Sequence, residues 1–266
     1  MVNYMKSEFY RIFHDRTIYL LTAVITGIAV FVNVVLYLFE VNTTNFPYGN
    51  VRFSFINLIT GMPIFYIGAM LVVMLLSSDE YKNGVLKNAV AGGLSRTRIF
   101  IGKCIVYSVT AMGSAAVILA AYISTAYGLL EYDPAVALES SLPLRILLTG
   151  AAANLPFSLA AVILTVALNQ NFKKESHVCI IWALIVYLIP NVLWILGLKL
   201  PLCARIAEWL PWNFLRTEVS AAYSSRQMDA LWMHPEGFWK LMIVGVVGIV
   251  LFGAAGIASF RKKDIS

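Results

Sequence analysis

The stretch of this sequence best equipped for chemistry is SDEYKNGVLKNAVAGGLSRTRIFIGK, residues 78–103, which carries two acids and five bases between two long apolar runs. Within it, Tyr81, Val85 and Ala89 recur at every fourth residue, with Leu86 and Val90 beside them. That spacing puts them on one face of a helix of about three turns, away from the lysines. An amphipathic helix needs an apolar partner, which could be lipid, the rest of the chain or another protein.

The end of this helix is predicted at Gly92-Gly93, because glycine is the usual residue after a helix C-terminus. Ser95 can then cap a second helix. That helix is expected to run through Arg96 and Lys103 directly into the next apolar run.

Other residue types that do chemistry are scattered. The three histidines, His14, His177 and His234, do not cluster, and the three cysteines form no CxxC pair and are expected to be small buried hydrophobes. The one Gly-Lys pair, Gly102-Lys103, has Thr97 where a phosphate-binding loop needs its first glycine. We therefore expect no enzyme, no metal site and no cofactor on this chain.

The elements that must position residues 78–103 are apolar helices. Of the 266 residues 60% are hydrophobic and 13% charged, against about a quarter charged in soluble domains. Crossing about 30 Å of hydrocarbon takes about 20 apolar residues, and such continuous runs exclude barrel strands. We predict an all-α membrane protein, one domain over residues 1–266, with six transmembrane helices at about 17–39, 54–77, 104–130, 146–169, 178–198 and 241–260.

Lysines and arginines set the expected orientation. Thirteen of the 20 lie in the segments 1–16, 78–103, 170–177 and 261–266. Positive segments remain in the cytoplasm, so both termini are predicted there. The net charge of +6 is thus mainly an orientation signal and indicates no nucleic-acid partner.

Two further segments have amphipathic or aromatic character. Residues 1–16 are predicted to form an interfacial helix with a stripe of Met5, Phe9, Ile12 and Phe13. Residues 199–240, on the opposite side, are interpreted as short helices in or dipping into the outer leaflet, or alternatively as a loop with a packed aromatic cluster. This outer-leaflet aromatic region contains Trp209, Trp212, Trp232 and Trp239.

The predicted spans hold no ionisable side chain, which argues against a proton-coupled carrier or an ion pore. Small residues in the third, fourth and sixth spans predict close helix packing. The amides Asn33, Asn57, Asn154 and Asn191 predict hydrogen bonds between helices. Pro63, Pro156 and Pro190 are placed to kink three of the spans.

Residues 78–103 also carry a family resemblance. Glu80, Gly84 and Leu86, a glycine-rich break, Ser95-Arg96 and finally Gly102-Lys103 resemble the segment between the second and third spans of ABC-2 type transporter permeases. The layout of interfacial helix, six spans and short outer helices is similar over essentially the whole chain. The sequence departs from the family at residues 89–93, where many members carry a proline before the Ser-Arg pair.

The resemblance implies an ABC-2 (type V exporter-like) fold in which residues 78–103 are a coupling segment for two separate ATPase subunits that hold the ATP and Mg. A second permease chain, the same or similar, would complete a twelve-span unit in a bacterial plasma membrane. The cargo would be amphipathic or hydrophobic: a peptide, a toxin or a lipid-like molecule. The interface would use Glu80, Tyr81, Lys82, Gly84, Val85, Leu86, Lys87, Ala89, Val90, Arg96 and Arg98.

Three alternatives are less consistent with these residues. Residues 78–103 could be a solvated loop with no partner. A membrane-embedded enzyme would need paired catalytic groups at one depth. A non-transporting membrane partner, such as an immunity or sensor-associated subunit that binds peptides, would share the spans and would lack ATP-driven transport.

Overall fold

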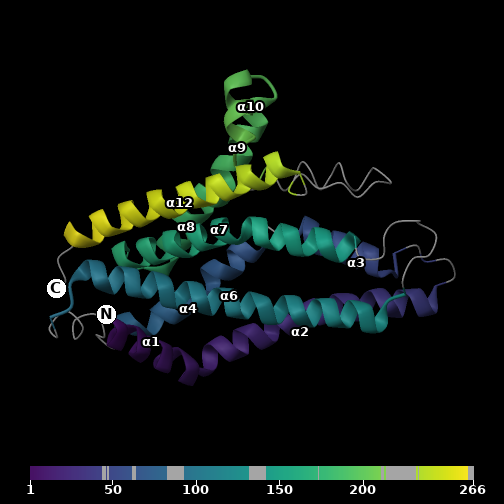
Figure 1. Cartoon of the computed structure of the whole chain (residues 1–266), viewed down its shortest axis with the longest axis horizontal. Coiled ribbons are helices and arrows are strands. Elements are labelled where there is room, and N and C mark those ends of the chain that lie inside the picture. Colours follow the sequence, from purple (N-terminus) through teal and green to yellow (C-terminus); the bar gives the residue numbers. More distant parts are fainter. Residues whose placement is uncertain are drawn as a thin grey trace.

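The computed structural model describes residues 1–43, 46, 48–61, 64–82, 93–131, 142–172, 174–210, 213, 232 and 234–262. Every regular element in this part of the chain is a helix (Figure 1). The helices are α1 (Val2–His14), α2 (Arg16–Asn42), α3 (Val51–Thr60), α4 (Ile64–Lys82), α6 (Arg96–Leu129), α7 (Leu142–Asn171), α8 (Glu175–Ala183), the π-helix η1 (Leu184–Leu188), α9 (Ile189–Gly197), α10 (Pro201–Ala207) and α12 (Pro235–Lys262).

Five helical units of the described chain are long and apolar enough to cross a membrane: α2, α6, α7, the continuous unit α8–η1–α9, and α12. They correspond to the predicted first, third, fourth, fifth and sixth spans. The chain is therefore an all-helical, multi-pass membrane protein. α1 and the C-terminal end of α12 lie at the same end of the bundle (Figure 1).

The predicted second span is not one continuous helix. It is divided into α3 and α4, with a turn at Gly61, and its longest apolar helical piece is Ile64–Ser77. The sequence between the two helices is Gly61-Met62-Pro63. Glycine disfavours helix, and proline lacks an amide donor and restricts the residue before it. A kink was predicted at Pro63, which lies outside the described residues; the structure has two separate helices, one ending at Thr60 and one beginning at Ile64.

The predicted fifth span is continuous but irregular. The π-helix η1 separates α8 from α9 just before Pro190. Proline offers no amide hydrogen to the carbonyl one turn earlier, and a local widening of the helix accommodates that loss. Asn213, far along the chain, donates a side-chain hydrogen bond of 2.7 Å to the carbonyl of Pro190. By contrast, α7 runs through Pro156 without interruption.

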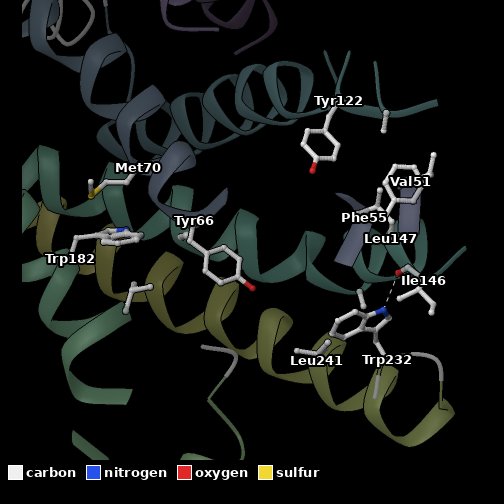
Figure 2. Packing of buried hydrophobic residues seen from close by; sticks show 14 of the residues in the cluster. Val51, Phe55, Tyr66, Met70, Tyr122, Ile146, Leu147, Trp182, Trp232 and Leu241 are labelled. Atoms are coloured by element: carbon white, nitrogen blue, oxygen red, sulfur yellow. Dashed lines mark hydrogen bonds between the residues drawn. The ribbon is translucent and has the colours of Figure 1, made fainter. Parts of the chain in front are cut away.

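The centre of the bundle is α7, which packs against α12, α4, α6, α3 and α8. One buried cluster joins α3, α4, α7, α8 and α12 around Tyr66, Phe55, Leu147 and Trp182 (Figure 2). A second cluster joins α1, α2, α4, α6, α7 and the end of α12 around Phe100, Tyr107 and Phe260. The projecting α9–α10 pair packs mainly on itself (Figure 1).

Small residues bring α12 close to α7. A β-carbon on Gly256 would clash with the ring of Phe100 and stand 2.9 Å from Ala167, and one on Gly248 would stand 3.0 Å from Ala160. The predicted close packing is confirmed for the fourth and sixth spans. It is not found for the glycines of the third span, because Gly113 and Gly128 have no neighbour within 4 Å of the position of a β-carbon.

Candidate functional site

The start of α6 has the local structure that the sequence predicts. Ser95 is the N-cap of α6, and its hydroxyl accepts a hydrogen bond of 3.4 Å from the amide of Arg98. Gly93 has a φ of 82°, a left-handed conformation that glycine adopts without strain. From Arg96 the helix continues without a break to Leu129, so the predicted run into the third span is confirmed.

The predicted coupling residues fall into three groups. Glu80, Tyr81 and Lys82 form the last turn of α4, which continues past the predicted end of the second span. Arg96 and Arg98 lie in the first turn of α6. The predicted amphipathic helix beyond residue 82 lies outside the described residues, and so do Gly84, Val85, Leu86, Lys87, Ala89 and Val90.

The first turn of α6 is joined to the last turn of α12. Arg96 donates a hydrogen bond of 3.1 Å from Nη1 to the carbonyl of Arg261, and Arg261 donates one of 3.0 Å from Nε to the hydroxyl of Thr97. These contacts hold the two helix ends together at the end of the bundle where α1 lies (Figure 1). Arg98 is exposed beside them.

A polar network, in which Glu8 is buried and Arg11 half-buried, connects α1 to both α4 and α6. Arg11 pairs with Glu8 at 2.7 Å, donates to the hydroxyl of Tyr107 at 3.3 Å, and donates to the carbonyl of Leu76 at 3.5 Å. Ser77 of α4 and Tyr107 of α6 are also hydrogen-bonded to each other. The network therefore joins three helices, and two of its members, Arg11 and Tyr107, lie 96 positions apart in the chain.

The Gly102-Lys103 pair faces this network. The ring of Tyr4 lies so close to Gly102 that a β-carbon there would stand 3.0 Å from two of its carbons. Lys103 is only 5% exposed and interacts electrostatically with Glu8, which is 3% exposed. Burial, and then the Glu8 carboxylate, raise the pKa of Tyr4, so its phenol stays protonated and donates a hydrogen bond to Glu8.

The sequence analysis missed this network. Phe13, predicted to lie in the apolar stripe of the first helix, is exposed, while Glu8 and Ile12 face the bundle. One sequence feature could have predicted the burial of Glu8: it lies three residues after Met5 and four before Ile12, on the edge of that apolar stripe. Lys103 was placed just outside the third span, but it is buried within α6.

Inter-helix amide contacts lie deeper in the bundle. Asn33 of α2 donates to the carbonyl of Tyr122 at 3.0 Å and to the hydroxyl of Thr125 at 2.9 Å, and it accepts from the hydroxyl of Ser54 at 2.6 Å. Tyr66 of α4 donates to Asn154 of α7. The prediction that Asn33 and Asn154 join helices is confirmed, and the contacts of Ser54 hold α3 to α2 and α6. The amide of Asn191, for which the same was predicted, instead donates at 2.7 Å to the carbonyl of Tyr187 one turn earlier in its own span.

The outer tryptophans have two different environments. Trp209 is 51% exposed, follows the short helix α10, and lies 4.9 Å from the ammonium of Lys240 on α12. Trp239 is 62% exposed. Trp232 differs, because it is buried in the core and its indole donates a hydrogen bond of 3.0 Å to the carbonyl of Ile146 (Figure 2). Trp212 lies outside the described residues.

Metal-ligating side chains do not gather in the part of the chain that the structure describes: no group of three or more His, Cys, Asp or Glu could hold an ion there. No family model matches the chain, and no curated protein matches it either. The resemblance to ABC-2 type permeases therefore depends on the motif and the helix layout.

Proposed function

We propose that this chain is the permease subunit of an ATP-driven exporter of the ABC-2 type. Two separate ATPase subunits would dock on residues 78–103 and hold the ATP and Mg. The chain itself would catalyse no reaction. It would move an amphipathic or hydrophobic cargo, such as a peptide, a toxin or a lipid-like molecule, out of the cytoplasm.

The proposal is supported chiefly by the positions of α4 and α6, the helices that lead into and out of the charged segment 78–103. Both helices meet α1 at the end of the bundle where the C-terminal end of α12 also lies (Figure 1). α6 has 34 residues, which at about 1.5 Å per residue exceeds the roughly 30 Å of hydrocarbon by about 20 Å. An overhang of this size would place the start of α6 in the aqueous phase, where a soluble ATPase can reach it.

The interface in this proposal uses the apolar stripe of Tyr81, Val85, Leu86 and Ala89 in a cleft of the ATPase. Charged residues such as Glu80 and Lys87 would pair at its rim. The contact of Arg96 with Arg261 adds a detail: this arginine supports the stem of the segment by holding α6 to α12. Arg98, which is exposed, is the better candidate for a rim contact.

The membrane arrangement in this proposal has six spans, with α3 and α4 together making the second. Both termini and residues 78–103 would be cytoplasmic, in a bacterial plasma membrane. Two such chains, identical or related, would form a twelve-span unit surrounded by lipid. Glu8 and Lys103 are buried and Arg11 is half-buried. The predicted spans themselves hold no ionisable side chain, which suits a hydrophobic cargo.

The test is to purify the chain from its native membrane in a gentle detergent and to identify the proteins that accompany it by mass. The proposal expects a protein with a Walker phosphate-binding loop in near-stoichiometric amount. Its consistent absence, with the permease folded and abundant, would contradict the proposal.

The second candidate function is a non-transporting membrane partner, such as an immunity or sensor-associated subunit that binds peptides. The exposed aromatic side chains Trp209 and Trp239 would suit such binding. Sealed inside-out vesicles separate the two candidates, because an exporter accumulates cargo only when ATP is supplied outside, whereas a binding subunit retains peptide equally without ATP.

A further inference from the structure

Arg11 of α1 hydrogen-bonds both to α4 and to α6, the helices that lead into and out of residues 83–92. Its guanidinium reaches Leu76, six residues before the end of α4, and Tyr107, eleven residues after the start of α6. Glu8, one turn earlier in α1, holds the guanidinium from the other side at 2.7 Å.

The chemistry of arginine suits this position. A guanidinium has five N–H donors in a fixed planar fork, so it can donate hydrogen bonds to a carboxylate, a phenol and a backbone carbonyl at the same time. The carbonyl of Leu76 fixes the backbone of α4, and the phenol of Tyr107 fixes the side of α6. A lysine ammonium is a point charge on a flexible stem and could not hold all three groups in one plane.

Stability alone does not account for these charges. Glu8 and Lys103 are almost completely buried, and removing a charged group from water costs several kcal/mol. Replacing such a network by apolar side chains of similar volume is often neutral or stabilising, and in some proteins buried charges instead specify a single geometry. Here that geometry is the placement of α1 against both α4 and α6.

The Gly102-Lys103 pair supports the same conclusion independently. Gly102 gives the ring of Tyr4 room to lie against α6, and Lys103 faces Glu8. Both residues of the Gly102-Lys103 pair therefore interact with α1. The motif resembles a phosphate-binding pair in sequence, but its contacts are those of a helix-docking site.

We propose that Arg11 is a positioning residue that, with Glu8 and Tyr107, locks α1 onto α4 and α6 and thereby fixes the relative placement of the two helices that carry the docking segment. The purpose of this lock depends on the proposed function, because only a docked partner needs the two stems in a defined arrangement. The lock itself depends only on the contacts of this chain.

The first test measures the lock in the purified chain without any partner. Spin labels are placed at the exposed positions Leu71 on α4 and Arg98 on α6, with the three native cysteines changed to alanine, and the distance distribution is recorded in lipid nanodiscs. We expect a narrow distribution in the parent, a broad one in Arg11→Met, and an intermediate one in Arg11→Lys. A narrow, unshifted distribution in Arg11→Met would overturn the proposal.

Two further variants keep the test decisive. Lys6→Met removes an exposed cation from the same helix and is expected to leave the distribution unchanged. An equal broadening in Lys6→Met would contradict a specific role for Arg11. If Arg11→Met does not fold, Tyr107→Phe removes only the phenol oxygen that Arg11 contacts. It is expected to broaden the distribution to a smaller extent, and no broadening would count against the lock.

The second test asks whether the lock serves docking. The co-purifying ATPase is titrated onto the parent and the variants, and Arg11→Met is expected to bind it about tenfold more weakly, with Arg11→Lys partly restored. If the parent binds an ATPase and Arg11→Met binds it equally well despite a broadened distance, the link to docking is wrong. If the parent binds none, the proposed function fails, while the distance measurement still decides whether Arg11 positions the helices.

Discussion

Gly245 of α12 lies directly against Pro156 of α7. A β-carbon on Gly245 would stand 2.6 Å from the β-carbon of Pro156, 2.8 Å from its carbonyl carbon and 2.7 Å from the nitrogen of Phe157. Real β-carbons essentially never come so close, and two of these neighbours are backbone atoms that cannot rotate away. The contact lies between α7 and α12, the two most extensively packed helices among those described.

Changing Gly245 to alanine is therefore expected to destabilise the protein by about 1–3 kcal/mol, the usual cost of overpacking a tight contact. The measurement is the thermal unfolding of the purified chain in detergent or nanodiscs. Gly253→Ala is the matched control, because Gly253 lies on the same helix with no neighbour within 4 Å of its β-carbon position. Equal losses in both variants would show that the contact with Pro156 is not the cause.

The amide of Asn33 joins three helices and predicts a second loss of stability. Asn33→Ala removes one acceptor of the buried Ser54 hydroxyl, which keeps its contact of 2.9 Å with the hydroxyl of Tyr122. It also removes the bonds from Asn33 to the carbonyl of Tyr122 and to Thr125. Hydrogen bonds between membrane helices contribute about 1 kcal/mol on average, so we expect a loss of about 1–2 kcal/mol. Asn191→Ala is the control, since Asn191 is half-buried and its amide donates to the carbonyl of Tyr187 in its own span. A larger effect at Asn191 would contradict this account.

The tryptophans predict a difference that lipid quenching can detect. In variants that retain one tryptophan each, phospholipids brominated on their acyl chains are expected to quench Trp209 and Trp239, which are exposed, and to leave Trp232 largely unquenched. The order of quenching is read from the emission of each variant in vesicles. Strong quenching of Trp232 would mean that its indole faces lipid and that the contact with Ile146 is not kept.

The positions of the membrane helices could be predicted because length and apolar composition determine them locally. The Ser95 cap and the continuity of α6 followed from residues a few positions apart. The interruption at Gly61-Met62-Pro63 was underestimated, because the apolar run continues through it and only the backbone preferences of the three residues oppose a helix. An apolar pattern reports burial in lipid and does not report where the helix ends.

The α1 network could not be predicted for a different reason. An apolar stripe identifies a face from hydrophobic residues alone, so an acid on that face is assigned to water. Whether Glu8 is buried depends on Arg11 and on Lys103, and Lys103 lies 95 positions away in the chain, the difference between residues 103 and 8. Such long-range pairing has no local signal in one sequence. The contact of Arg11 with the carbonyl of Leu76 is likewise invisible, because every residue carries the same backbone acceptor.

Changing Val85 and Leu86 together to aspartate is the most direct test of the proposal that residues 78–103 dock an ATPase. Two carboxylates on the apolar stripe would have to be buried in the cleft of the partner, which is strongly unfavourable. The control is Lys174→Asp with Ser176→Asp, two exposed positions in another segment predicted to be cytoplasmic. Each form is purified from its native membrane, and the accompanying proteins are identified by mass. The account predicts a Walker-containing ATPase with the parent and with the control, and its loss from a folded Val85→Asp, Leu86→Asp variant. Equal retention by that variant, or no ATPase with any form, would contradict it.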